Sequence, residues 1–476
     1  MNYETVIGLE VHVQLNTASK MFCGCSTRFG VPPNTQVCPV CLGFPGALPV
    51  INKQAMRLAI TTALALHCTI ARFTKFDRKH YYYPDLPKNF QISQYDKPLS
   101  YDGMLEIETS GSSKKINLKR IHLEEDAGKL IHQEGGDYSL VDYNRAGTPL
   151  MEIVTQPDIR SPDEAYEFLT KLKGILEYVE VSDCNMEEGS LRCDANISIR
   201  PAGQTALGTK TEVKNMNSFK AVRQALEYEA KRQRELLATG KTIVQETRLW
   251  DSDRQLTDSM RSKEEAHDYR YFPEPDLPPL VVSKEHLDEI RRSLPELPAA
   301  RFARFVTSYG LSEYEAGVLT ADKAAADYFE ETVKTFSRPK IVANWVMGDL
   351  AALVSSTGLS FRTIGVRPTD LSGLLMCIED NSASAKMAKE ALKISVESGK
   401  APKLIIQEKG TQISDVHELM YVIEKVITLH PKVVADFKSG KQEALTFLVG
   451  QVMKETKGKA HPKLANDLLL KKLREG

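Results

Sequence analysis

The chain has 476 residues, of which 42% are hydrophobic and 26% charged, and its formal net charge is −1. This length exceeds one ordinary hydrophobic core, so we expect several domains. A net charge near zero excludes a global attraction to nucleic acid or membrane, and any basic site must be local. No apolar run approaches the roughly 20 residues of a membrane span. The N-terminus lacks the basic and apolar regions of a secretory signal. We therefore expect a cytoplasmic protein with no membrane partner.

The first predicted element is a strand in GLEVHVQL, residues 8–15. Apolar and polar side chains alternate here, which is typical of a strand with one buried face. The other face would carry Glu10 and His12, two residues apart. A solvated strand face has no need for an imidazole beside a carboxylate, so this pair is a candidate functional site.

Four cysteines follow as CGC, then twelve residues, then CPVC; they are Cys23, Cys25, Cys38 and Cys41. Four thiolates in tetrahedral geometry suit zinc with no open position, so this spacing predicts a structural Zn²⁺ site. The alternatives are a disulfide pair and four unrelated thiols. In a cytosolic protein these cysteines should be reduced.

Residues 75–95, KFDRKHYYYPDLPKNFQISQY, interleave basic and aromatic side chains. Cations for phosphates and rings for base stacking fit an unpaired nucleotide end. An amphipathic strand and loop whose tyrosines pack in the core would explain the pattern equally well. The sequence leaves both readings open.

Further strands and helices complete an α+β pattern. The Ser161-Pro162 cap opens a helix to about Tyr178, and a second helix runs from Ser218 to about Thr239. Together these elements predict a mainly antiparallel sheet with one face on the core and one polar, mixed-charge face. The alternating segments are KRIHLEEDAG (119–128), TPLMEIVTQP (148–157), SLRCDANISIRP (190–201) and KTEVKN (210–215).

The polar faces of these strands offer several possible metal ligands. Carboxylates that converge on a sheet repel one another unless a cation or protons lie between them. Oxygen ligands with an imidazole suit Mg²⁺ or Mn²⁺, and Mg²⁺ usually accompanies phosphate. The alternative is a set of surface carboxylates paired with Lys and Arg. The candidates are Glu10, His12, Glu124 or Glu125, Glu152, Asp194 and Glu212.

Strand alternation bears on the choice between the two adjacent glutamates. If His122 faces the site, Glu124 does too and Glu125 faces away, unless a bulge or the strand end intervenes. A phosphate loop is incomplete in this chain, because GKT at 240–242 and GK at 128–129 both lack the glycine five places earlier. Any ATP site must therefore belong to a different class.

In the last part of the sequence the alternating strand patterns give way to a proline-rich segment and then to helical patterns. YFPEPDLPPL, residues 271–280, has four prolines and predicts a stiff connector. Helical patterns follow, with a break near Gly410 and then a basic tail that is either a solvated surface or an RNA contact. We therefore predict domains at 1–294, 295–409 and 410–476.

These segments, taken together, resemble the B-subunit family of the bacterial glutamyl/aspartyl-tRNA amidotransferases. The resemblance runs from residue 4 to near the end of the chain. It is carried in order by ETVIGLEVHVQL, SKMFCGC, CPVCLGFPGALPVINK, FDRKHYYYPDLPKNFQISQY, HLEEDAGK, NRAGTPLMEIVTQPDIRSP, EEGSLRCDANISIRP, EVKNMNSF, DYRYFPEPDLPPL and FLVGQVMKETKGKA.

The resemblance implies a catalytic cradle related to glutamine synthetase and guanido kinases, followed by helical and tail domains that contact tRNA. It implies a heterotrimer with an amidase-type partner, which releases ammonia from glutamine, and a small third partner. The chain would use ATP to convert the side-chain carboxylate of misacylated Glu-tRNA(Gln) or Asp-tRNA(Asn) to an acyl phosphate. Ammonia would then displace phosphate to give Gln-tRNA(Gln) or Asn-tRNA(Asn).

The resemblance also implies roles for particular residues. It assigns a Mg²⁺ site to His12, Glu125 and Glu152, with Glu10 near a second cation, and so overrules the register preference for Glu124. Lys79 would guide phosphate or ammonia. The expected nucleotide contacts are Arg192, Asp194, Asn196 and Lys214. The zinc ligands would be Cys23, Cys25, Cys38 and Cys41.

Two other functions remain to be separated from this one. A zinc-stabilised RNA-binding scaffold without chemistry would keep full activity after Glu152→Gln. A free-standing amino-acid ligase of glutamine synthetase type would need the carboxylates but no tRNA.

Overall fold

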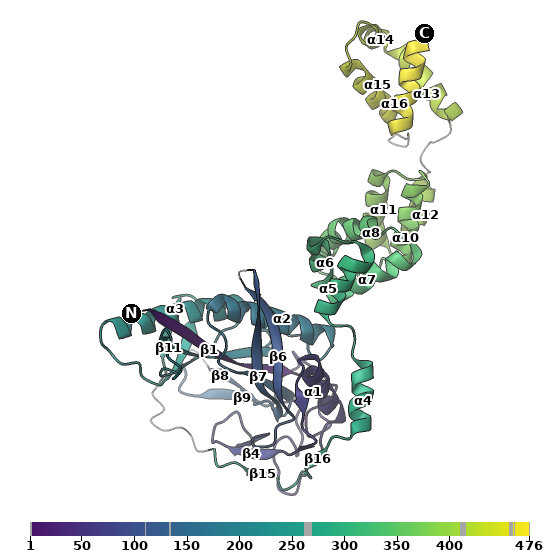
Figure 1. The fold of residues 1–476 in the computed structure, drawn as a ribbon. Coiled ribbons are helices and arrows are strands. Elements are labelled where there is room, and N and C mark those ends of the chain that lie inside the picture. The colour runs from purple at the N-terminus through teal and green to yellow at the C-terminus, as the bar shows by residue number, and fades with distance from the viewer. Residues whose placement is uncertain are drawn as a thin grey trace. The chain divides into compact units, whose positions relative to one another are not determined.

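The structure is a computed structural model that describes residues 2–109, 111–132, 135–260, 269–409, 416–456, 460 and 462–475. It divides into two compact units, Met1–Leu297 and Pro298–Gly476. The first unit holds the strands and four helices of the described chain (Figure 1). Its helices are α1 (Lys53–Ala65), α2 (Pro162–Tyr178), α3 (Phe219–Ala238) and α4 (Lys284–Ser293).

The strands of the first unit lie in one large sheet and three small ones. Those of the large sheet, in spatial order, are β14 (Leu256–Ser259), β13 (Thr247–Asp251), β12 (Thr211–Lys214), β11 (Leu191–Pro201), β1 (Tyr3–Gln14), β10 (Pro149–Thr155), β7 (Ser112–Glu125), β6 (Ser100–Thr109) and β2 (Thr69–Ile70). The small sheets contain β15 (Phe272–Pro273), β4 (Asp77–His80) and β5 (Phe90–Ser93); β16 (Leu280–Val281) and β3 (Phe73–Thr74); and β8 (Lys129–His132) and β9 (Ser139–Asp142).

The described part of the large sheet is antiparallel except where β12 runs parallel to β13. The predicted α+β class with a mainly antiparallel sheet is therefore confirmed. The relation to the glutamine synthetase cradle remains a prediction.

Strand β1 shows the predicted alternation of buried and polar side chains. Ile7, Leu9, Val11 and Val13 are at most 1% exposed. Their face packs in one core with apolar residues of α1, α2 and α3, and Figure 1 shows α2 and α3 running across the sheet. Because the helices cover the apolar face, the opposite face of these strands is left to polar side chains.

The two long helices begin where the sequence predicts. The Ser161 hydroxyl accepts a hydrogen bond from the backbone N–H of Glu164 (3.1 Å), and Pro162 occupies the first turn of α2. The Ser218 hydroxyl accepts from Ala221 N–H (3.1 Å) in the same way at α3. These caps satisfy backbone donors that have no partner within the helix.

The proline-rich segment, predicted as a stiff connector, also takes part in sheet pairing, which the sequence did not indicate. Phe272 pairs with Arg78 between β15 and β4, and Leu280 pairs with Thr74 between β16 and β3. Glu274 between them is 3% exposed. The prolines stiffen a segment that completes two small sheets, because edge strands tolerate a residue without a backbone donor.

The second unit contains helices only, among its described residues. One core includes residues from Phe305 to Ile406 and another includes residues from Leu419 to Leu473. The predicted boundary at Gly410 lies outside the described residues, as does part of the basic tail. None of the described helices has the length and apolar character to cross a membrane.

The helical elements of this unit are α5 (Pro298–Tyr309), α6 (Glu313–Thr320), α7 (Lys323–Thr335), α8 (Pro339–Trp345), η1 (Val346–Leu350), α9 (Ala351–Thr357), α10 (Pro368–Glu379), α11 (Ala385–Ser398), α12 (Pro402–Lys409), α13 (Val416–Leu429), α14 (Pro431–Lys438), α15 (Glu443–Glu455) and α16 (Pro462–Glu475).

Candidate functional site

Strand register aligns three polar residues across the middle of the sheet. His12 on β1 lies opposite Glu152 on β10, and Glu152 lies opposite His122 on β7. Residues directly opposite each other in antiparallel strands share a face and lie close together. The sheet therefore places two imidazoles on either side of one carboxylate.

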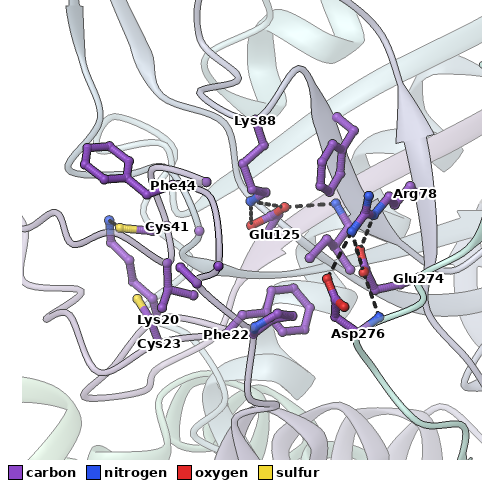
Figure 2. Close-up of a pocket in the computed structure, with 18 residues that line it drawn as sticks. Lys20, Phe22, Cys23, Cys41, Phe44, Arg78, Lys88, Glu125, Glu274 and Asp276 are labelled. Atoms are coloured by element: carbon purple, nitrogen blue, oxygen red, sulfur yellow. Dashed lines mark hydrogen bonds and ion pairs between the residues drawn. The ribbon is translucent and has the colours of Figure 1, made fainter.

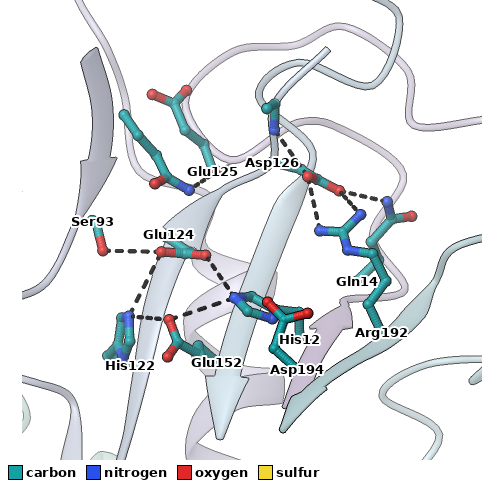
Figure 3. Close-up of polar contacts among 12 residues, drawn as sticks. His12, Gln14, Ser93, His122, Glu124, Glu125, Asp126, Glu152, Arg192 and Asp194 are labelled. Atoms are coloured by element: carbon teal, nitrogen blue, oxygen red, sulfur yellow. Dashed lines mark hydrogen bonds and ion pairs between the residues drawn. The ribbon is translucent and has the colours of Figure 1, made fainter. Parts of the chain in front are cut away.

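Glu124 joins this row, two residues along β7 from His122. His12 Nε2 lies 3.6 Å from a Glu152 oxygen and 3.7 Å from a Glu124 oxygen. His122 Nε2 lies 3.1 Å from Glu152 and 3.6 Å from Glu124. We call these four residues the carboxylate–imidazole cluster (Figure 3). Within it, ligand atoms of His12, Glu124 and Glu152 all lie within 4.8 Å of one another.

Charges within the cluster control its protonation. Burial opposes ionisation of His122, yet the charge of Glu152 and the hydrogen bond with Glu124 raise its pKa to about 9. Burial also opposes ionisation of Glu152. The charge of His122 and the hydrogen bonds from both histidines are stronger, and they hold the pKa of Glu152 well below its usual value. The imidazoles and carboxylates of the cluster therefore favour one another's charged forms.

The structure corrects the position expected for Glu125. The ladder between β7 and β10 runs without interruption from Glu125 opposite Pro149 to Arg120 opposite Val154. The bulge that would have brought Glu125 to the cluster does not occur between these residues, so alternation places Glu124 there instead. Figure 3 shows the Glu125 carboxylate turned away.

Glu125 is held on the other side of its strand by a different set of partners. Its carboxylate accepts hydrogen bonds from Lys88 Nζ (2.7 Å) and from the backbone N–H of Ile92 (2.9 Å). Glu125 and Lys88 line a pocket of about 260 Å³, together with Arg78 and Glu274. Figure 2 shows the pocket, which also reaches the thiols of Cys23 and Cys41.

The four residues expected to contact the nucleotide lie on the same face as the cluster. Arg192 lies opposite His12, and Asp194 lies opposite Glu10. The charged residues among them each have an ion-pair partner, and Asn196 donates a hydrogen bond to Glu10. The contacts are Arg192 with Asp126 (3.0 Å twice), Lys214 with Asp194 (2.8 Å) and Glu212 (3.1 Å), and Asn196 Nδ2 with Glu10 (3.0 Å).

Glu10 lies beside the cluster but outside the group of potential ligands. Burial raises its pKa, and the negative charges of Glu152, Glu212 and Asp194 add to the effect. A carboxylate in this position gains from any cation that enters the polar face.

Lys79, on β4, lies within electrostatic range of Glu124. Its ammonium lies 4.9 Å from the ring centre of Tyr269 and 5.9 Å from that of Tyr81. Burial opposes ionisation of Glu124, but the hydrogen bond from His122 and the charges of His122 and Lys79 lower its pKa. The basic-aromatic segment therefore adjoins the cluster, with Tyr81 partly buried and Tyr82 and Tyr83 exposed.

The four predicted zinc ligands converge. Ligand atoms of Cys23, Cys25, Cys38 and Cys41 lie within 4.8 Å of one another, and the Cys38 and Cys41 sulfurs are 3.9 Å apart. Tetrahedral zinc with Zn–S bonds of about 2.3 Å requires sulfurs roughly 3.8 Å apart, so the residues fit this ion. The fully buried Lys20 lies with its Nζ 3.7 Å from the Cys41 sulfur. Its ammonium would offset part of the negative charge of four thiolates around a bound metal ion.

Gly43 connects the thiolate loop to the pocket. Its φ is +70°, and a methyl group there would overlap Lys88 Cγ and lie 3.2 Å from Lys88 Cβ and Cδ. Gly46 has a similar φ of +81° with open space around it. We expect Gly43→Ala to lower the free energy of unfolding more than Gly46→Ala, by about 1–3 kcal/mol. Urea unfolding of both variants checks this, and equal losses would contradict the packing argument.

Sequence reasoning left His122 and Asp126 out of the site. Because side chains alternate between the two faces of a strand, His122 and Asp126 lie on the same face as Glu124, and this alternation was the available signal. Asp126 is 4% exposed and binds Arg192, so it fixes a side chain directly opposite His12.

The fold and the site define a class: an α+β protein whose antiparallel sheet carries a carboxylate–imidazole site, followed by a helical region. Residues 5–288 match the GatB/GatE catalytic domain, and residues 327–473 match the GatB domain. The chain therefore belongs to the GatB/GatE family.

Relatives match over the whole chain. The B subunit of the aspartyl/glutamyl-tRNA(Asn/Gln) amidotransferase of Caldanaerobacter subterraneus subsp. tengcongensis is 59% identical, covering 99% of this chain and 100% of the relative. The protein of the same name from Carboxydothermus hydrogenoformans is 58% identical and covers 99% of each chain.

Proposed function

We propose that this chain is the component of a tRNA-dependent amidotransferase that activates and amidates the aminoacyl group. Its substrates would be Glu-tRNA(Gln), Asp-tRNA(Asn) or both. The carboxylate–imidazole cluster carries the proposal, because a scaffold has no use for buried carboxylates gathered on a sheet face. The full-length similarity to proteins named as the B subunit of an amidotransferase supports it.

The proposed reaction has two steps. An oxygen of the substrate side-chain carboxylate attacks the γ-phosphorus of ATP, the bond to the β-phosphate oxygen breaks, and ADP leaves. Ammonia then attacks the acyl carbon, the bond to the phosphate oxygen breaks, and phosphate leaves as the nitrogen loses a proton. Activation is needed because a carboxylate has no good leaving group.

The donor set suits Mg²⁺, since carboxylate oxygens with one imidazole are ligands that this ion accepts. We infer that His12, Glu124 and Glu152 hold it, with Glu10 close to a second cation. When bound, Mg²⁺ would neutralise phosphate charge and orient the reacting oxygens. His122 would hold the Glu152 carboxylate in place through its 3.1 Å contact. Arg192, Asp194, Asn196 and Lys214 remain the proposed nucleotide contacts.

Ammonia would come from glutamine through the amidase partner, with the small third partner completing the heterotrimer. The pocket beside Glu125 and Lys88 and the cation of Lys79 lie where ammonia or phosphate could be guided. The helical and basic tail regions would contact the tRNA, and we propose the cytoplasm as the location.

The deciding experiment measures phosphate release by the complete heterotrimer, using ATP and ammonium chloride, with and without Glu-tRNA(Gln). We expect release to require the misacylated tRNA and to produce Gln-tRNA(Gln). ATP consumption with free glutamate in place of tRNA would indicate a free-standing ligase. Binding of tRNA without ATP consumption would indicate a scaffold.

We further propose that the four cysteines hold structural Zn²⁺. Metal analysis should find about one zinc per chain, and Cys41→Ser should lose it and lower the melting temperature. Cys377→Ser, in the second unit, is the control that should retain zinc. A zinc-free wild-type chain with unchanged melting temperature in chelator would contradict the proposal.

A further inference from the structure

Most cations on the polar face of the sheet are neutralised by a neighbouring carboxylate. Arg192 is bound by Asp126, and Lys214 by Asp194 and Glu212. Arg120 differs. Its Nε is buried and has no hydrogen-bond partner in the described part of the chain, and none of the ion pairs described there involves its guanidinium.

Arg120 lies on the same strand as the cluster. It is two residues before His122 on β7 and opposite Val154, which is two residues beyond Glu152 on β10. Alternation places residues 120, 122 and 124 on one face, and two residues along a strand span about 7 Å. A side chain as long as arginine can therefore reach a group that is also bound by the cluster.

A break in the strand register lies beside this side chain. The register between β7 and β10 shifts at Val154 and Thr155, immediately beyond Arg120. Such irregularities redirect side chains and are frequent beside active sites. The charges of Arg120, Glu124 and Glu152 all act on the partly buried Tyr271 hydroxyl. Burial is the main cause that raises the pKa of Tyr271, the charge of Glu124 raises it further, and the charge of Arg120 lowers it. The guanidinium and the cluster carboxylates therefore both act on the Tyr271 hydroxyl through their charges.

A partly buried cation without a counter-ion is costly, so its presence indicates an anionic ligand. Phosphoryl transfer requires a cation of this kind. Negative charge spreads over three oxygens of the transferring group while a negatively charged carboxylate approaches it. A guanidinium can bind two phosphate oxygens in parallel without losing its proton.

We propose that Arg120 is a phosphate-binding residue of this site, and that its guanidinium contacts the phosphoryl group as it passes from ATP to the aminoacyl carboxylate. The inference rests on the proposed function. In the step that Arg120 assists, the bond from the carboxylate oxygen to phosphorus forms while the bond from phosphorus to the ADP oxygen breaks. ADP takes the electron pair, and Arg120 stays protonated throughout.

The test compares Arg120→Ala, Arg120→Lys and the control Lys119→Ala in the complete heterotrimer. Lys119 is the adjacent, exposed cation of the same strand. The readout is phosphate release with Glu-tRNA(Gln), ATP and ammonium chloride. We expect Arg120→Ala to lower the rate by about 10²–10³-fold, as loss of one transition-state charge contact does. Arg120→Lys should fall between, and Lys119→Ala should match wild type.

Chemical rescue separates a phosphate contact from a packing role. Millimolar guanidinium should restore the rate of Arg120→Ala at least about tenfold, since it can occupy the vacated space. The affinity of the cluster for Mn²⁺ should not fall in this variant. The proposal is overturned if neither added guanidinium nor the Arg120→Lys substitution gives a higher rate than Arg120→Ala alone, and if the melting temperature of Arg120→Ala is lowered. Arg120 would then have a structural role.

Glu152→Gln is measured alongside to distinguish two kinds of failure. If Arg120→Ala keeps more than half of the rate while Glu152→Gln loses it, the Arg120 proposal is wrong and the proposed function stands. If both variants keep their rate, the proposed function fails, and the Arg120 proposal fails with it.

Discussion

Glu152→Gln is expected to abolish tRNA-dependent phosphate release, lowering its rate by at least about 10²–10³-fold. The substitution keeps the size of the side chain but removes the negative charge between His12 and His122. A neutral amide would leave the proposed Mg²⁺ with two of its three protein ligands. It would also remove the interaction that holds both imidazoles in position.

The assay uses the complete heterotrimer, ammonium chloride as nitrogen source, and Glu-tRNA(Gln). Glu187→Gln is the matched control, because Glu187 is exposed in a turn of the same unit. Binding of Glu-tRNA(Gln) should be retained in both variants. A Glu152→Gln complex with wild-type phosphate release would place the chemistry outside this chain and favour the scaffold.

Glu124→Gln and Glu125→Gln are expected to affect different properties, Mn²⁺ affinity and stability respectively, although the residues are adjacent. Glu124→Gln removes a carboxylate from the cluster, so the affinity for Mn²⁺ should fall by at least about 10²-fold. Glu125→Gln leaves the cluster intact, so Mn²⁺ affinity should stay within about twofold of wild type.

The second variant should instead lose stability. Lys88 is almost buried, with a side-chain exposure of 11%, and its ammonium depends on Glu125. Weakening that pair should lower the free energy of unfolding by about 1–3 kcal/mol. Electron paramagnetic resonance of Mn²⁺ and urea unfolding measure the two quantities. Loss of Mn²⁺ binding in Glu125→Gln alone would restore the assignment implied by the family resemblance.

Local pattern determined the elements of this protein. The alternation in GLEVHVQL decides which side chains of β1 are buried and which, including His12, face away from the core. The caps at Ser161 and Ser218 decide where α2 and α3 begin. The cysteine spacing predicts the convergence that the structure shows. Each of these signals depends on neighbours a few residues away, so the sequence expresses them directly.

The tertiary structure decided which residues meet. His12, Glu152 and His122 become neighbours only because β10 lies between β1 and β7. Glu125 meets Lys88, 37 residues earlier in the chain, and the proline-rich segment pairs with β3 and β4. Strand order and register follow from burying apolar surface of the whole unit against its helices, and this balance has no local signature. The sequence by itself therefore defined the polar face and favoured Glu124 on it through strand alternation, and only the assembled sheet brought Glu124 beside His12 and Glu152.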